Sequence, residues 1–451
     1  MLPANELAKR LGYLFYIASP NETSFEKLED VPDYIVQAVP LFVVFVIVEL
    51  AFNLLHSKRD RFQIDDGLTS VSQGMLQELS RIFSEGAVLA SYVYVYNNYR
   101  IVTLPWNSVF TWFFALLAVD FAYYWVHRCS HEMNLAWAGH QVHHSSEFYN
   151  LTTALRQSVL QAYFDPVLYM PLAFVLSPSA YLVHHQFNRL YQFLIHTEAV
   201  QTLGPLEYFL NTPSHHRVHH GRDRYCIDKN YGGTLIIWDR MFGTFEAERC
   251  RPAYGLTHPV NTFDPWTLQV HQLQHIWNQV WKLEGIGNKL SAIFKGPGWE
   301  PGKPRLGDPN DIPDVSRPVE PYASKASALC KFYVCAHFIL LILGYVRLNH
   351  LKWELEATTL ACGIGYITFS LAVMGTFLDG RSCACLLEVI RCALLFVLDG
   401  CVFHLGVPGS QIVGPAGLIT FAKVAYALSL TGALVECLRG IRITDKRMKA
   451  N

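Results

Sequence analysis

The chain of 451 residues is rich in apolar side chains and carries almost no net charge. Apolar residues make up 51% of it and charged residues only 16%, against about 25% charged residues in soluble domains, which argues against a soluble fold and predicts an integral membrane protein. Because 36 basic residues nearly balance 37 acidic ones, no net positive charge favours nucleic acid as a partner.

The N-terminal part begins with a polar segment, 1–34, which we expect to be lumenal. Its short apolar run LGYLFYIAS is broken by Pro20, so no cleaved signal peptide is expected. The first candidate span, Tyr34–Leu55, has about the 20 residues that a bilayer core requires. The basic sequence HSKRDR follows it, and basic flanks favour the cytoplasmic side.

Two further apolar runs, 82–99 and 109–126, predict a second and a third crossing. We therefore expect N-terminal membrane helices over 35–104, followed by a core over 105–294. The third run leads directly into His127. Since two crossings return the chain to the cytoplasm, the histidine-rich segment that follows is predicted to lie at the cytoplasmic face.

Eight histidines of this core form three compact groups with the sequences HRCSH, HQVHH and HHRVHH. They are His127 and His131, then His140, His143 and His144, then His216, His219 and His220. Spacings of three and four residues place side chains on one face of a helix. Imidazole is the commonest metal ligand among side chains, and eight rings exceed the about four ligands of one zinc ion. The pattern predicts two metal ions, and an all-nitrogen set suits zinc, iron or copper.

The interval between the second and third groups, 158–176 and 178–200, predicts a helical hairpin that brings the third group beside the first two. Ser177 is expected to cap the return arm, with Pro178 in its first turn. That arm carries polar residues at helical spacing, namely His185, Arg189, Gln192 and His196. Polar side chains at membrane depth normally face a cavity or a site.

The remainder of the chain begins with the amphipathic sequence LQVHQLQHIWNQVWKL, expected on the membrane surface or against the site. A connector rich in proline and glycine, 295–327, precedes C-terminal membrane helices over 328–451. Four apolar runs there are long enough to span a membrane; they lie near 330–347, 356–377, 384–404 and 412–437. The basic tail LRGIRITDKRMK favours a cytoplasmic end. The predicted fold is all-α and polytopic, a bundle of about nine membrane-inserted helices with a cytoplasmic-face eight-histidine di-metal site.

Two carboxylates near the histidines are candidate catalytic residues. Asp120 precedes His127 by two helical turns on the same face, and Glu132 adjoins His131. Either could accept a ligand N–H or relay a proton. A carboxylate at a helix end that faces water is the alternative, and it is weaker for Asp120, which lies within an apolar run. A membrane di-metal site that faces an apolar cavity is suited to oxidising unactivated C–H bonds with oxygen.

The three histidine sequences, with LYQFLIHTE between them and NYGGTLIIWDRMFGTF after them, resemble the membrane fatty acid hydroxylase and sterol desaturase superfamily over roughly residues 105–250. Its pattern, HX3–4H, HX2–3HH and HX2–3HH, implies two non-haem irons held by the eight histidines. The resemblance adds His196 as a ninth ligand and leaves Gln192 beside the site. Whether the neighbouring His215 is a ligand stays open.

Within the superfamily, the segment HQVHHSSEFYNLTTALRQS and the four extra spans are most similar to an ether-lipid-cleaving branch of the endoplasmic reticulum membrane. The resemblance implies O2-dependent hydroxylation of the carbon next to the ether oxygen of alkylglycerols and lyso-alkyl phospholipids, with tetrahydrobiopterin as electron donor and fatty aldehyde as product. No residue of this chain is singled out for the pterin. For the lipid head group, candidates are Arg156, Arg222 and Arg224.

Two alternatives keep the histidines and change the chemistry. A sterol or sphingolipid hydroxylase or desaturase would use the same ligands with a b-type cytochrome as donor. A histidine-lined metal transporter is the less favoured alternative, because transporters place their ligands mid-membrane on several spans, whereas these groups follow helix ends.

Overall fold

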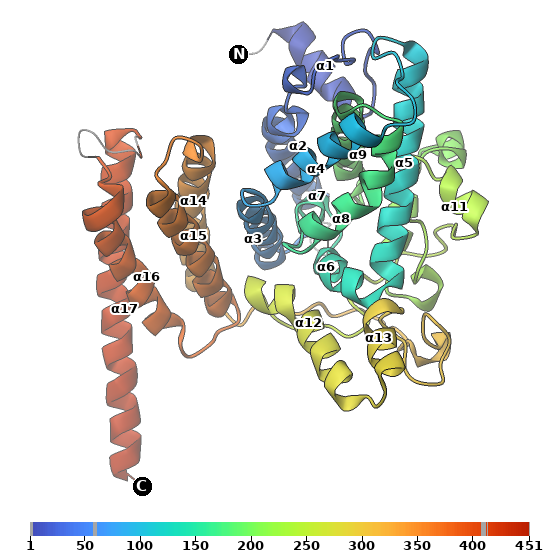
Figure 1. The fold of residues 1–451 in the computed structure, drawn as a ribbon. Helices are drawn as coiled ribbons and strands as arrows, with labels where there is room; N and C mark the ends of the chain where they lie inside the picture. The colour runs from blue at the N-terminus through green and yellow to red at the C-terminus, as the bar shows by residue number, and fades with distance from the viewer. Residues whose placement is uncertain (1–2, 57–60, 407–411, 413, 451) are drawn as a thin grey trace. The chain divides into compact units, whose positions relative to one another are not determined.

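The computed structural model describes residues 3–56, 61–406, 412 and 414–450, and within them the chain is helical, with no β-strand. It divides into two compact units, each described by itself. The first comprises residues 1–260 and 269–321, and the second comprises residues 261–268 and 322–451. Figure 1 colours the helices from the N-terminus to the C-terminus.

The helices of the first unit are mostly short. They are α1 (Ala4–Leu14), η1 (Leu28–Asp30), α2 (Tyr34–Leu55), α3 (Ile64–Arg81), α4 (Glu85–Tyr99), α5 (Val109–Glu132), α6 (Asn134–His144), α7 (Leu151–Ala154), α8 (Gln161–Tyr169), η3 (Met170–Phe174), α9 (Pro178–Ile195), η4 (Gly204–Tyr208), α10 (Pro213–His219), η5 (Arg224–Cys226), α11 (Ile237–Phe242), α13 (Ile286–Phe294) and η6 (Pro309–Asp311). Helix α12 (Pro265–Lys282) begins in the second unit and continues into the first.

The second unit contains α14 (Ala328–Leu351), α15 (Ala357–Leu378), α16 (Ala384–Leu398), the π-helical turn η7 (Asp399–Phe403) and α17 (Ala416–Ala450). Its interior holds a buried ion pair between Arg391 and Glu388, 2.5 Å apart, and the Arg391 guanidinium also contacts His337 and the Tyr426 hydroxyl. Charged groups inside an apolar bundle are costly unless they are paired and hydrogen-bonded in this way.

Helices long and apolar enough to cross a membrane number five among the described residues. They are Leu28–Leu55, Val109–Glu132, Ala328–Leu351, Ala357–Leu378 and Ala416–Leu438. This agrees with a membrane protein, and α2 has the bounds expected from the sequence. The other expected insertions correspond to shorter helices such as α4 and α16, so a total of nine stays a prediction.

The basic flank after α2 lies mostly in residues 57–60, outside the described part of the chain. Helix α3, which follows, was not expected; it is amphipathic and its inner face is buried in the first unit. The predicted hairpin consists of α8, η3 and α9. Ser177 caps α9 as expected, accepting a hydrogen bond from the Ala180 N–H at 3.3 Å with Pro178 in the first turn.

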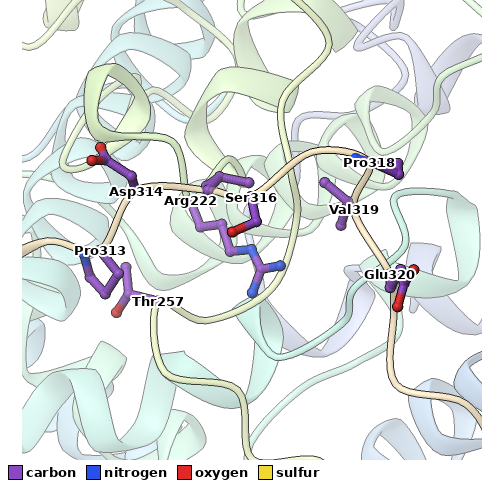
Figure 2. Close-up of a pocket in the computed structure, with 9 residues that line it drawn as sticks. Arg222, Thr257, Pro313, Asp314, Ser316, Pro318, Val319 and Glu320 are labelled. Carbon is purple, nitrogen blue, oxygen red and sulfur yellow. The ribbon is translucent and has the colours of Figure 1, made fainter.

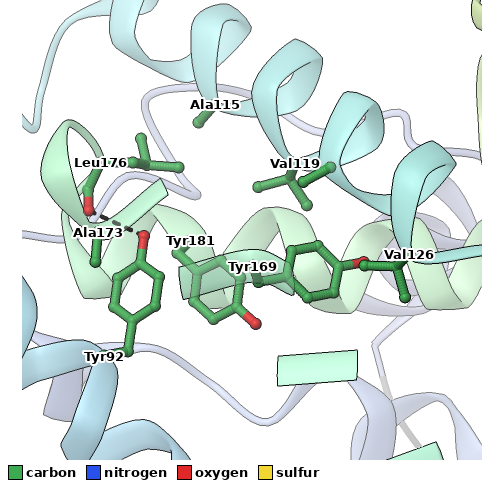
Figure 3. Close-up of a cluster of buried hydrophobic side chains, with 9 residues drawn as sticks. Tyr92, Ala115, Val119, Val126, Tyr169, Ala173, Leu176 and Tyr181 are labelled. Atoms are coloured by element: carbon green, nitrogen blue, oxygen red, sulfur yellow. Dashed lines mark hydrogen bonds between the residues drawn. The ribbon is translucent and has the colours of Figure 1, made fainter. Parts of the chain in front are cut away.

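Helix α5 is held by an apolar cluster around its buried face (Figure 3). Val119 and Val126 of α5 pack there with Leu176 and with Tyr181 of α9, and the Tyr92 hydroxyl of α4 donates to the Leu176 carbonyl at 3.1 Å. Opposite this cluster, α5 exposes large apolar side chains such as Phe110, as expected of a lipid-facing surface. The packing fixes α5, whose last turns carry His127 and His131, and α9, whose C-cap is His196.

Candidate metal centre

Nine buried histidines converge into two groups in the first unit, and within each group the candidate ligand atoms lie within 4.8 Å of one another. The five-histidine group is His127, His131, His140, His144 and His219. The four-histidine group is His143, His196, His216 and His220. The third sequence group therefore lies beside the first two, as the hairpin predicted.

Four helices deliver these side chains. The last turns of α5 provide His127 and His131, and α6 provides the second sequence group. His196 is the C-terminal cap residue of α9, and α10 with its C-cap provides the third group. The adjacent residues of an HH pair diverge: His143 and His144 enter different groups, as do His219 and His220. Each HXXHH sequence thus supplies histidines to both groups.

The donor nitrogens are spaced as ligands of a common ion would be. Nε2 of His140 lies 3.0 Å from Nε2 of His127 and 3.2 Å from Nε2 of His144. In the other group, Nε2 of His196 lies 3.1 Å from Nε2 of His143 and 3.0 Å from Nε2 of His216. Two nitrogens bound at about 2.1 Å to one metal lie about 3.0–3.4 Å apart. The donor set therefore fits two metal ions.

The opposite ring nitrogens are held by backbone carbonyls. Nδ1 of His127 lies 2.8 Å from the Tyr231 oxygen, and Nδ1 of His219 lies 2.9 Å from the Lys229 oxygen. Nδ1 of His143 and Nδ1 of His196 have carbonyl partners at 3.0 and 2.7 Å, from Arg156 and Gln192 respectively. A carbonyl accepts only from a protonated nitrogen, so each contact leaves Nε2 as the free lone pair.

Burial keeps these rings neutral. It lowers the pKa of His143 to about 4 and lowers the pKa values of His140 and His216 well below 6.5, with neighbouring imidazoles adding to the effect at the latter two. Among the described residues, the buried Nε2 atoms of His219 and His220 have no hydrogen-bond partner. Neutral imidazoles with unsatisfied buried lone pairs are the form that binds a metal.

A loop that the sequence analysis did not single out orients the five-histidine group. Its carbonyls at Lys229 and Tyr231 accept from two ligands, and its Asp228 carboxylate lies 3.8 Å from Nδ1 of His131. Asp228 and Asn230 have positive φ angles of 57° and 55°, which Asn and Asp tolerate better than other side chains. Part of this loop, from Asn230 onward, begins the sequence NYGGTLIIWDRMFGTF that carries the resemblance, but that sequence did not indicate this role.

Asp120 is fully buried and anchors the segment that follows this loop. Its Oδ1 accepts from Asn188 Nδ2 at 2.6 Å and from the Thr234 N–H at 2.7 Å. Its Oδ2 accepts from the Leu235 N–H at 3.0 Å and the Trp238 indole at 2.9 Å. The carboxylate therefore joins α5 to α9 and to the segment leading into α11.

Glu132 ends α5 beside His131 and forms two ion pairs. Arg128 Nε lies 2.8 Å from its Oε1, and Arg305 Nη1 lies 2.7 Å from its Oε2. Its side chain is only 13% exposed, so the alternative of a carboxylate that merely faces water does not describe it. Arg305 therefore joins the end of α5 to the segment after α13, whereas Arg128 lies one turn earlier on α5 itself.

Gln192 of α9 and His215 of α10 also lie close in sequence to the candidate ligands. The Gln192 carbonyl accepts from Nδ1 of His196, and the Gln192 side-chain amide donates to Asn188 Oδ1. His215 lies outside both groups, where its ring contacts Phe245 at 5.3 Å and its carbonyl accepts from Asn230.

The head-group candidates lie in different surroundings. Arg156 is buried and ion-paired with Asp66 at 2.5 Å, so it is not available to a lipid. Arg222 lines an open polar pocket of about 490 Å³ next to the connector (Figure 2). Arg224 pairs with Asp314 at 3.2 Å.

The Fatty acid hydroxylase family model matches residues 112–244, the part of the chain that carries all nine of these histidines. A second model, the alkylglycerol monooxygenase C-terminal domain, matches residues 330–405. The chain is 53% identical to the alkylglycerol monooxygenase of Xenopus tropicalis, over 87% of this chain and 88% of the relative. It is 51% identical to that of Homo sapiens, over 85% and 86%. The chain belongs to the alkylglycerol monooxygenase family. No solved structure matches it.

Proposed function

We propose that this protein is a membrane-bound di-iron monooxygenase that cleaves the O-alkyl bond of alkylglycerols and lyso-alkyl phospholipids. The observation that carries the proposal is the convergence of nine buried histidines into two groups in a chain of the alkylglycerol monooxygenase family. The reaction adds one oxygen atom of O2 to the carbon next to the ether oxygen. The resulting hemiacetal separates into a fatty aldehyde and a glycerol derivative.

The five-histidine group would hold one iron and the four-histidine group the other. Bound iron would supply the redox chemistry that activates O2. This chain's own residues hold the ligand rings by their Nδ1 atoms, keep them neutral by burial and exclude water. We assign all nine histidines as ligands and leave His215 out, because it points toward Phe245.

The electron balance requires a donor. Insertion of one oxygen atom, with release of the other as water, consumes two electrons and two protons beyond those of the C–H bond. We propose tetrahydrobiopterin as the donor, on the resemblance to the ether-lipid branch. A b-type cytochrome is the competing donor, because the resemblance to sterol and sphingolipid hydroxylases and desaturases of the same superfamily implies it.

We also propose an endoplasmic reticulum location with the metal centre at the cytoplasmic face. A lumenal N-terminus followed by α2, α4 and α5 would deliver the end of α5 to that face. Nine insertions, the connector over 295–327 and C-terminal helices over 328–451 complete this topology. The five long apolar helices and the basic C-terminal sequence support it.

Both candidate carboxylates fit a positioning role. Asp120 acts on the metal centre through Asn188 and the segment at Thr234, since these groups occupy its oxygens. Glu132 holds the end of α5 beside His131 through its two arginines. A proton relay through either carboxylate stays a prediction.

A donor-exchange assay tests the function. Purified full-length protein in lipid nanodiscs receives an alkylglycerol, O2 and either tetrahydrobiopterin or reduced b-type cytochrome, and fatty aldehyde is measured. Aldehyde that requires the pterin is expected. Aldehyde with cytochrome alone would overturn the donor assignment. If no aldehyde forms and the protein instead carries ions across vesicle membranes, the proposed enzymatic function would be overturned in favour of a metal transporter.

A further inference from the structure

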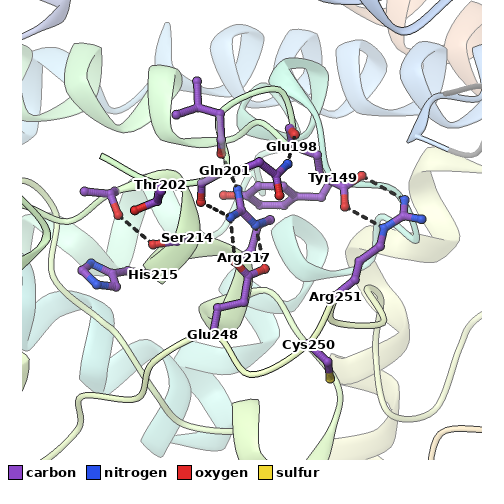
Figure 4. Close-up of polar contacts among 12 residues, drawn as sticks. Tyr149, Glu198, Gln201, Thr202, Ser214, His215, Arg217, Glu248, Cys250 and Arg251 are labelled. Carbon is purple, nitrogen blue, oxygen red and sulfur yellow. Dashed lines mark hydrogen bonds and ion pairs between the residues drawn. The ribbon is translucent and has the colours of Figure 1, made fainter. Parts of the chain in front are cut away.

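Arg217 lies between the ligands of the third histidine group and is almost completely buried, with 4% of its side chain exposed. All five of its guanidinium N–H groups are used (Figure 4). Nε and Nη2 donate to the two carboxylate oxygens of Glu248 at 2.7 and 2.6 Å. The others donate to the carbonyls of Thr197, Val200 and Gln201 at 3.3, 2.7 and 2.7 Å.

The three carbonyls belong to the irregular segment that directly follows His196. Carbonyls in such a segment need donors when buried, because no helix or sheet satisfies them. Arg217 provides these donors from α10, which also carries His216 and is capped by His220. Its guanidinium therefore joins the two chain segments that bring three of the four ligands of one group together.

The five-histidine group is supported elsewhere. Its His127 depends on the Tyr231 carbonyl, and the Tyr231 and Gly232 N–H groups donate to Asp239 at 2.7 and 2.8 Å. Thr244 also donates to Asp239, at 2.7 Å. This set of contacts shares no residue with the Arg217 set. The outer partners of the two groups are therefore different, although α6 and α10 each supply ligands to both groups.

We propose that Arg217 is a positioning residue for the four-histidine group and that the two metal positions can be lost one at a time. The inference rests on the proposed di-metal centre. Lysine at this position keeps the charge, but its single nitrogen has three donors and cannot bridge a carboxylate and three carbonyls. Removing an outer partner of a metal ligand typically weakens metal binding about 10–100-fold.

Metal content of the full-length chain tests this without an activity assay. R217K should lose one of the two ions, whereas R249K, at a nearby arginine that is 63% exposed, should keep both. E248Q leaves the contacts of Arg217 with the three carbonyls in place. It should therefore weaken binding of the same ion less than R217K does. D239N should release the other ion. The absorption spectrum of cobalt-loaded R217K should match that of His143→Ala and differ from that of His131→Ala.

Retention of both ions by R217K would overturn the inference. Equal loss of both ions would also overturn it, because Arg217 would then support the whole core. In that case the thermal unfolding midpoint of R217K would fall as well. An unsubstituted chain that binds no pair of ions would overturn the proposed function as well, which separates the two failures.

Discussion

The Nδ1 atom of His127 lies 2.8 Å from the carbonyl oxygen of Tyr231, a residue 104 positions further along the chain. The contact fixes the tautomer of a ligand at the end of α5 with a backbone group of a distant loop. Other ligands depend on carbonyls that are nearer in sequence, such as His219 on Lys229 and His196 on Gln192, and substitutions that displace these carbonyls should therefore affect the metal.

Neighbouring histidines 215 and 216 should differ sharply. His216→Ala removes a donor nitrogen 3.0 Å from that of His196 and should abolish one metal position and aldehyde formation. His215→Ala should retain both ions, because that ring lies against Phe245 outside both groups. Elemental analysis of the two purified variants measures this. Equal metal loss in both would contradict the ligand assignment.

Asp120→Asn should destabilise the core and reduce activity. The asparagine NH2 would face the donors of Leu235 and Trp238, and each buried donor left without an acceptor costs about 1–3 kcal/mol. Thermal unfolding in detergent measures the loss. Asp314→Asn is the control, since that side chain is 85% exposed and should be neutral. An unfolding midpoint that matches the control would contradict the anchoring role.

Metal-free protein should become less stable in mild acid. Burial lowers the pKa values of His143 and His215 to about 4, whereas in the unfolded chain they return to about 6.5. Between these values the unfolded state binds more protons, so stability is complete above pH 6.5 and falls by about 1.4 kcal/mol per pH unit and per histidine as the pH drops toward 4. Thermal unfolding of chelator-treated protein from pH 7.5 to about 4.5 should show the decline. A flat profile would contradict it.

The buried pair in the second unit should be more costly to break than to replace. Arg391→Met leaves the Glu388 carboxylate buried without its cation, which costs about 3–5 kcal/mol. The double variant with Glu388→Gln should recover much of that stability. Thermal unfolding of the single and double variants makes the comparison. Additive losses would show that the two side chains act independently.

The histidine groups and the class of protein could be predicted from the sequence. The i, i+3 and i, i+4 spacings of the histidines need only a helix to take effect, and α5, α6 and α10 supply it. The candidate membrane span at α2 and the helix cap at Ser177 could also be predicted from the sequence. The length of an apolar run and the capping of a helix depend only on residues that are adjacent in the chain.

The tertiary structure alone decided how the nine rings divide between two positions, because that division depends on the directions in which four helices point. It also decided the contacts of Arg217 and Asp239, because most of their partners are backbone carbonyl and N–H groups, which every residue has and which carry no sequence signature. Arg156 shows the same limit: the sequence offered it as a candidate for the lipid head group, and its ion pair with the distant Asp66 places it in the interior.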